Sequence, residues 1–234
     1  MNRVRPRRGA GALLLVLTLV PSFGCATFTY ERTAGGAPST GRRTNLRIGV
    51  TRFSGPDPAG FYPIWFSNTL ADPIGDLSRA VAVELRRSGL FADVIYLGVE
   101  KPAAADLAYY REVYQLDAVL DGDVSRFFVT AVAELWSLIP PLIVVWPLHF
   151  LGVPSAPSHD SVGMSGALSL QGLASGVAGW RSPELRLSWD EHVWYSVFTI
   201  PANERRLQTN ALDQFVAALA GTVCSAIDPE RAPR

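Results

Sequence analysis

The chain is poor in the residues and motifs that mark catalytic or nucleic-acid-binding proteins. No G-x-S-x-G, H-E-x-x-H, Walker loop or G-x-G-x-x-G occurs in its 234 residues. Its 21 basic and 21 acidic residues leave no basic excess to suit nucleic acid. We therefore expect no enzyme, no catalytic residue, no cofactor, no metal and no nucleic-acid partner.

Cysteine is also scarce. Only Cys25 and Cys224 are present, and a disulfide between them would tie the start of the chain to a distant helix in an oxidising compartment. If Cys25 is chemically modified, that disulfide cannot form. Cys224, at an apolar position of the last helix, is then most simply a small buried hydrophobe.

The chain begins with a basic end followed by a short apolar run. Residues 3–8 contain four arginines, Gly9–Val20 are twelve uncharged residues rich in leucine, and Pro21 ends the run. This order is typical of a secretory signal, and the run is too short to span a bilayer comfortably. We predict a signal peptide over residues 1–24. Without it, 17 basic and 21 acidic residues remain, a net charge of −4.

The residues Ser22-Phe23-Gly24-Cys25 resemble a bacterial lipobox, whose cysteine becomes the acylated first residue of the mature protein. The sequence departs from the lipobox pattern at Ser22, where leucine is usual, and at Phe23, which is larger than the usual residue. The resemblance implies lipidation of Cys25, by palmitate among other chains. Because Ala26 rather than aspartate follows, it also implies the periplasmic face of the outer membrane. The alternative is an ordinary signal peptidase cut near Gly24 or Ala26.

The mature chain is expected to be a flexible tether, residues 25–44, and a single α/β domain, residues 45–228, before a frayed tail, residues 229–234. The tether is polar, with glycine and proline and no apolar periodicity. The domain begins with alternating strands and helices, a pattern that favours βαβ units with right-handed crossovers. The expected elements are strand 46–53, helix 73–89, strand 92–97, helix 103–114 and strand 117–128.

Three stretches of this region resemble a known family. They are RIGVTRFSG at 47–55, VAVELRRSGLFADVIYL at 81–97 and YQLDAVLDGDVSRF at 114–127. They are similar to the N-terminal α/β domain of TolB and of the curli-secretion lipoproteins, and the likeness extends to the C-terminal hairpin and helix. Its motifs are structural, so it implies an α/β fold with a mixed sheet and an envelope compartment rather than an activity.

An apolar insertion, residues 129–158, interrupts this pattern. No charged residue occurs between 135 and 158, and Pro140 and Pro141 would break a spanning helix. Two short apolar helices are predicted, either as a buried hairpin over the sheet or as a surface for the membrane or a partner. A true membrane span is the third alternative. The possible contact residues are Trp136, Leu138, Ile139, Ile143, Trp146 and Phe150.

The C-terminal third is expected to be an antiparallel pair of strands and a closing helix. Strands are predicted at 166–173 and 185–189, joined by the loop Gly176–Glu184. We further predict a turn at residues 190–192, a central strand at 193–200 and a helix over Asn203–Ile227.

Two polar groups in this region could carry chemistry. Asp121 and Asp123 share one face of a strand, where a general acid/base role would require a cleft, and a solvated strand face is the simpler interpretation. Asp190, Glu191 and His192 could supply metal ligands, but neighbours on a strand point to opposite faces.

These observations predict a non-catalytic, membrane-anchored periplasmic lipoprotein that presents an α/β domain for assembly or partner binding. Its partners would be the membrane, through acylated Cys25, and envelope proteins or further copies of itself. The alternative is an auxiliary lipid- or solute-binding lipoprotein of an envelope transport system, whose apolar insertion holds an acyl ligand. A hydrolytic enzyme is a third possibility, for which the sequence contains no nucleophile motif.

Overall fold

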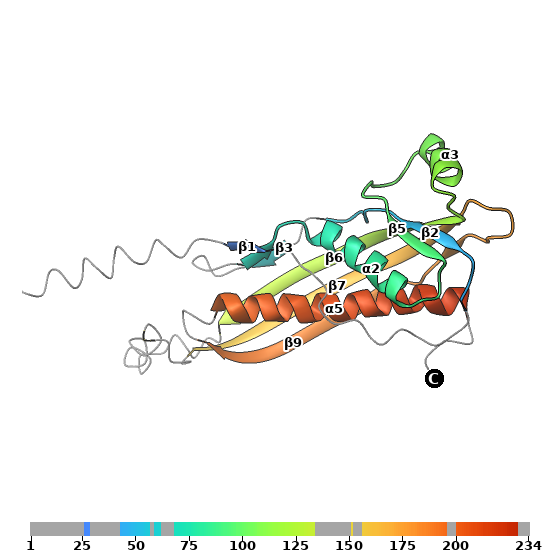
Figure 1. Cartoon of the computed structure of the whole chain (residues 1–234). Coiled ribbons are helices and arrows are strands. Elements are labelled where there is room, and N and C mark those ends of the chain that lie inside the picture. The colour runs from blue at the N-terminus through green and yellow to red at the C-terminus, as the bar shows by residue number, and fades with distance from the viewer. Residues whose placement is uncertain are drawn as a thin grey trace, which may run out of the picture.

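The computed structural model describes residues 26–28, 43–56, 59–61, 68–133, 151, 156–195 and 200–228. In this part of the chain a curved mixed sheet wraps around a long helix, with two shorter helices near one end (Figure 1). The predicted signal peptide and most of the predicted tether lie outside the described residues.

The predicted βαβαβ start is confirmed. Strand β2 (Arg47–Val50) is followed by helix α2 (Pro73–Arg87), strand β5 (Asp93–Tyr96), helix α3 (Ala104–Val113) and strand β6 (Ala118–Ala133). Strand β2 lies between β5 and β6 and is parallel to both. The mixed α/β fold class follows from this unit together with the antiparallel strands described below.

Helix α2 forms where its sequence predicts it. The Asp72 side chain accepts a hydrogen bond of 3.0 Å from the Gly75 N–H, and Pro73 occupies the first turn, where its missing N–H costs nothing. Gly89 follows the helix with a φ of 65°, a conformation that glycine adopts without strain. The apolar stripe of α2 is buried against the sheet and consists of Ile74, Leu77, Val81 and Leu85.

Strands β6 and β7 (Ala156–Gly172) form a long antiparallel ladder. Their pairing extends from Ala118 opposite Gly172 to Ala133 opposite Ser158, with a bulge near Val124. The strands therefore occupy both ends of the predicted insertion 129–158, where helices were expected. The alternation of small and apolar residues in 129–133 fits a strand as well as a helix start, and pairing with β7 selects the strand. Residues 134–150 and 152–155 lie outside the described residues.

The predicted antiparallel pair is confirmed, but both of its strands are longer than predicted. Strand β9 (Leu185–Tyr195) pairs with β7, and the connecting loop contains the two-residue strand β8 (Trp180–Arg181). The predicted turn at 190–192 is wrong, because these residues continue β9. The strand predicted at 193–200 is confirmed only over 193–195, where it continues β9 instead of forming a separate strand. Residues 196–199 lie outside the described residues, and a helix begins at residue 200. Asp190 and His192 lie on the exposed face of this strand, and Glu191 lies on the other face.

Short strands complete the described part. Strand β1 (Ala26–Phe28) pairs in parallel with β4 (Asn68–Leu70), and β3 (Ala59–Phe61) pairs with β6. Residues 26–28 fall in the predicted tether, which therefore is not without structure over its whole length.

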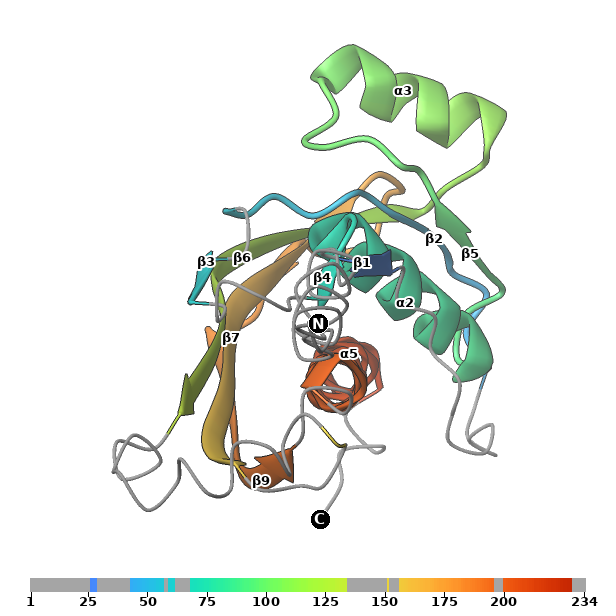
Figure 2. The same cartoon turned by 90° about the vertical axis from the view of Figure 1, so that its left-hand side faces the viewer.

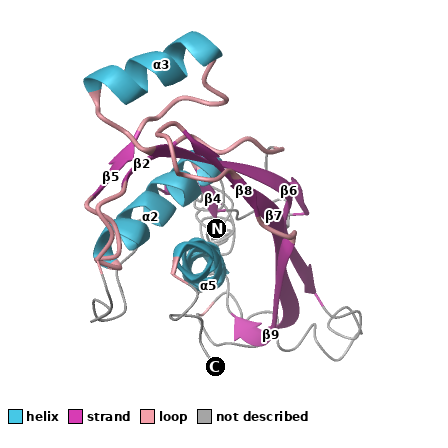
Figure 3. Cartoon of the chain, turned by 90° about the vertical axis from the view of Figure 1, so that its right-hand side faces the viewer, coloured by secondary structure: helices cyan, strands magenta, loops and turns pink. Residues whose placement is uncertain are grey.

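Helix α5 (Ile200–Ile227) begins three residues earlier than predicted and closes the core. Figure 2 shows α5 and α2 on the concave side of the sheet, and Figure 3 shows the same arrangement from the opposite side. The stretch Arg205–Ile227 is long and apolar enough to cross a membrane by length and composition, a test that core helices also pass. Its buried side chains identify it as a core helix: Leu207, Leu212, Phe215, Leu219 and Val223.

Candidate functional site

The residues that the sequence singles out most strongly lie outside the described residues. They are the predicted lipidation site Cys25 and the possible contact residues Trp136, Leu138, Ile139, Ile143, Trp146 and Phe150. Cys224 is described, and it lies half-buried against the core on α5.

Helix α3 (Ala104–Val113) is exposed along its whole length. None of its residues is buried, and Figures 1 and 2 show it standing apart from the sheet, away from α2 and α5. Tyr109 is 52% exposed, Val113 56% and Tyr114 40%. The sequence predicted the helix but contained no signal that its apolar side would remain uncovered.

Helix α3 is capped at its start and is connected to the sheet by the residues that follow it. The Ala103 N–H donates to the Asp106 carboxylate at 2.9 Å, which satisfies one N–H at the helix start. After the helix, Gln115 has a φ of 54°, and its side-chain oxygen accepts a hydrogen bond of 2.9 Å from the Arg47 guanidinium. Leu116 is then buried beside Gly49, where it returns the chain to the sheet. The described contacts that position α3 thus follow the helix, and none of its own residues is buried.

Three tyrosine rings form a cluster on α3. Tyr109 lies 6.0 Å from Tyr110 and 5.9 Å from Tyr114, and Tyr110 lies 6.0 Å from Tyr114, all between ring centroids. Partial burial by its neighbours, together with the nearby Asp106 carboxylate, raises the pKa of Tyr110 above its usual value. The cluster offers apolar rings with polar hydroxyl tips, a combination suited to binding.

A polar network at the start of α2 stabilises the fold. The Arg52 guanidinium donates to Asp72 at 2.8 Å and also contacts Glu100. Burial opposes ionisation of Asp72, but the hydrogen bonds from Arg52 and from the Gly75 N–H outweigh it, so the pKa of this carboxyl is lowered. Asp72 thus places a negative charge at the positive end of the helix and joins the segment after β2 to α2.

The two carboxylates on β6 also have partners. Asp121 accepts a hydrogen bond of 2.8 Å from the Thr51 hydroxyl, and Asp123 accepts one of 3.2 Å from the Ser54 hydroxyl. Both hold the segment that follows β2 against β6. The predicted solvated strand face is only partly correct, since Asp121 is half-buried, and these contacts give the pair a structural role.

Strand β9 separates the polar residues that the sequence places next to one another. His192 stacks on His159 of β7 with ring centroids 4.6 Å apart, and Asp190 lies 3.7 Å from the His159 ring. Glu191 points to the other face and accepts a hydrogen bond of 2.7 Å from Arg206 of α5. Within the described ranges, no group of three His, Cys, Asp or Glu residues could hold a metal ion. The pairing of the two histidines depends on strand register, which the sequence does not specify.

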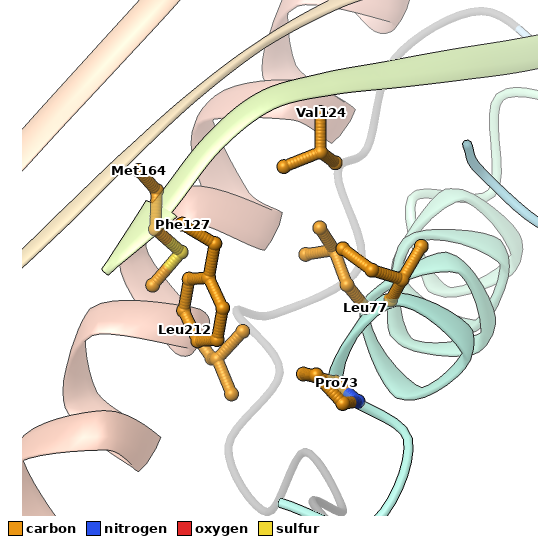
Figure 4. Close-up of a pocket in the computed structure, with 7 residues that line it drawn as sticks. Pro73, Leu77, Val124, Phe127, Met164 and Leu212 are labelled. Atoms are coloured by element: carbon orange, nitrogen blue, oxygen red, sulfur yellow. The ribbon is translucent and has the colours of Figure 1, made fainter. Parts of the chain in front are cut away.

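One apolar pocket lies between α2, α5 and the sheet (Figure 4). It is too narrow to admit a water molecule, so it is a packing gap of the core rather than a ligand site. Its lining residues are Pro73, Ile74, Leu77, Val124, Phe127, Met164 and Leu212.

No family model and no curated protein match the chain. The solved structures similar to it include a Xanthomonas campestris protein of the DUF330 family, at 13% identity and a TM-score of 0.46 over 88% of this chain and 99% of that one. Rare lipoprotein B of Shewanella oneidensis has 12% identity and a TM-score of 0.38 over 79% and 98%. A minor lipoprotein of Acinetobacter baumannii has 7% identity and a TM-score of 0.37 over 80% and 96%.

Bacterial lipoproteins are thus among the structures that the chain resembles. All three TM-scores lie below 0.5 and all three identities below 25%, so the likeness assigns neither a family nor a function. The resemblance to the TolB and curli-secretion domain stays a prediction.

Proposed function

We propose that the chain is a non-catalytic lipoprotein of the cell envelope, held at the periplasmic face of the outer membrane by acylated Cys25. The support for anchoring lies in the sequence, where the cysteine directly follows an apolar signal run. Several acyl chains on one cysteine would make the attachment effectively permanent. In this proposal the α/β domain, tethered close to the membrane, binds a second envelope protein.

The observation that carries the partner-binding proposal is helix α3. A ten-residue helix is marginally stable in water by itself, because nucleation costs more than so few hydrogen bonds return. Helices of this length are normally stabilised by burying an apolar face, and α3 buries none of its residues. Tyrosine is enriched at protein interfaces, because its ring is apolar and its hydroxyl polar. A protein that covers Tyr109, Val113 and Tyr114 would supply the missing burial.

Site-specific photo-crosslinking in intact cells tests this proposal. A photoreactive residue replaces Tyr109 in the full-length chain, and the matched control replaces Arg87, an exposed residue at the end of α2. We expect position 109 to give a covalent adduct with one discrete envelope protein and position 87 to give none. The proposal is wrong if position 109 gives no adduct, or if both positions give the same adducts.

The alternative function, an auxiliary lipid- or solute-binding lipoprotein, depends on the apolar segment outside the described residues. Native mass spectrometry of the full-length chain distinguishes the two functions. Lipid that co-purifies in addition to the chain's own acyl groups would favour the alternative.

A further inference from the structure

Strand β9 is a long edge of the sheet. It pairs with β7 along one side over residues 185–195, and no strand in the described part of the chain pairs with its other side. Figures 2 and 3 show β9 and β5 at opposite ends of the curved sheet. Unpaired backbone N–H and C=O groups along such an edge are a template for pairing with another chain.

The two faces of β9 differ in character. Arg186, Ser188 and Asp190 point to the exposed face, while Leu187 and Trp189 are half-buried and pack against the core. A closed twofold dimer through this edge keeps the same face of both sheets on one side, so residues of like face oppose each other. The side-chain pairs of each possible register can therefore be compared directly.

We propose that two copies of the chain pair antiparallel along β9, with Ser188 opposite Ser188 of the second copy. This register places Arg186 of each copy, which also contacts Glu184 of its own chain at 2.6 Å, opposite Asp190 of the other copy. Two ion pairs between the copies then form on the exposed face. The register also places Leu187 opposite Trp189 on the core face. Cross-strand pairs of opposite charge and of aromatic with aliphatic residues stabilise antiparallel sheets. Leu185 and Glu191 oppose each other at the ends, and Glu191 keeps its contact with Arg206.

Charge complementarity selects this register over its neighbours. A shift that centres the axis on Trp189 places Arg186 opposite His192 and Asp190 opposite Ser188, so neither ion pair forms. A further shift places Asp190 opposite Asp190, and directly opposed like charges destabilise a sheet. A shift in the other direction, to Leu187, places Arg186 opposite Ser188 and Asp190 opposite Glu184, which are both acidic. The partner is therefore a second copy of this chain, docked at a surface separate from α3.

Charge reversal on the full-length chain in detergent tests the register. In each of the two proposed pairs, R186D places an aspartate opposite Asp190, and D190R places an arginine opposite Arg186. We expect wild-type chains with two different tags to co-purify, and each variant to associate with itself at least about tenfold more weakly. A mixture of R186D with D190R should recover wild-type association, because acidic then faces basic at both pairs. R181D, which reverses an exposed arginine on β8 outside the overlap, should leave association unchanged.

Each of these measurements can overturn the proposal. The proposal is overturned if wild-type chains do not associate, or if either variant self-associates as strongly as the wild type does. It is also overturned if the two variants both have native circular dichroism spectra and yet do not associate with each other. A second measurement avoids charge changes altogether. S188C should form a disulfide-linked pair of chains under mild oxidation, and S175C, exposed in the loop after β7, should not. Absence of the S188C pair also overturns the proposal. Photo-crosslinking at α3 is independent of all these results.

Discussion

At the scale of single residues, we expect alanine at two different glycines to change the free energy of unfolding in opposite directions. A Cβ on Gly122 would lie 2.5 Å from Cγ of Phe53, whose ring is 1% exposed and packs over this glycine. We expect G122A to lower the free energy of unfolding by about 1–3 kcal/mol, because the buried ring has to move. A Cβ on Gly221, in the C-terminal part of α5, would meet nothing within 4 Å.

G221A is the matched control, and it should raise the free energy of unfolding by about 0.5–1 kcal/mol because alanine favours a helix. Urea denaturation of both variants measures the two effects. Stabilisation by G122A, or a large loss in G221A, would contradict the packing described above.

Asp72 combines a helix cap with an ion pair, and two substitutions separate these roles. D72A removes both and should lower the free energy of unfolding by about 1 kcal/mol or somewhat more. D72N keeps a capping oxygen and loses only the charge, which should cost about 0.5 kcal/mol because the side chain is half exposed. Equal losses in both variants at pH 7 would show that the cap contributes nothing.

The lowered pKa of Asp72 fixes the pH dependence of this effect. A carboxyl with a lower pKa in the folded state stabilises the fold above its unfolded pKa, and this stabilisation is lost as the pH falls through the folded value. The difference between wild type and D72N should therefore be present at pH 7 and shrink below about pH 4. Urea denaturation across this range measures it, and a difference that grows in acid would contradict the ion pair.

At the same scale, the sequence predicted the cap but not the contact at Gly122. Asp72, Pro73 and the apolar stripe behind them are local in sequence, so a helix start can be recognised without a structure. The position of Phe53 over Gly122 depends on how the segment after β2 lies along β6. That register is a property of the sheet and not of either segment alone.

At the scale of elements, the contrast between α2 and α3 shows what periodicity can and cannot predict. Both helices were predicted, because apolar residues recur on one side of each. Periodicity identifies the residues that share a face but not the element that covers it, so the exposure of α3 could not be predicted. The error in β9 has a related cause: three polar residues in succession suggested a turn, but two of them occupy the solvated face and Glu191 contacts Arg206.

The same contrast predicts how substitutions in the helices affect stability. L212A, which enlarges the gap between α5 and α2, should lower the free energy of unfolding by about 2–5 kcal/mol. Y109S on α3 should change it by less than about 0.5 kcal/mol, because that side chain packs on no core residue. Thermal or urea denaturation measures both, and a loss in Y109S as large as that in L212A would show that α3 belongs to the core.

At the scale of the whole molecule, the proposed attachment and the proposed contacts use separate parts of the chain. The predicted anchor precedes the domain, whose core lies between the concave face of the sheet and the helices α2 and α5. Helix α3 and strand β9 lie in different places on this body, so a partner on α3 and a second copy on β9 use separate surfaces. In the proposed function, the lipid anchor at Cys25 determines where either contact would occur.

Metabolic labelling with palmitate tests this attachment most directly, by comparing the full-length chain with its C25S variant in cells. We predict that the wild-type chain incorporates label and stays with the membrane fraction, and that C25S incorporates none because serine has no sulfur to acylate. A wild-type chain without label, or a C25S chain that is still labelled, would contradict the lipoprotein assignment.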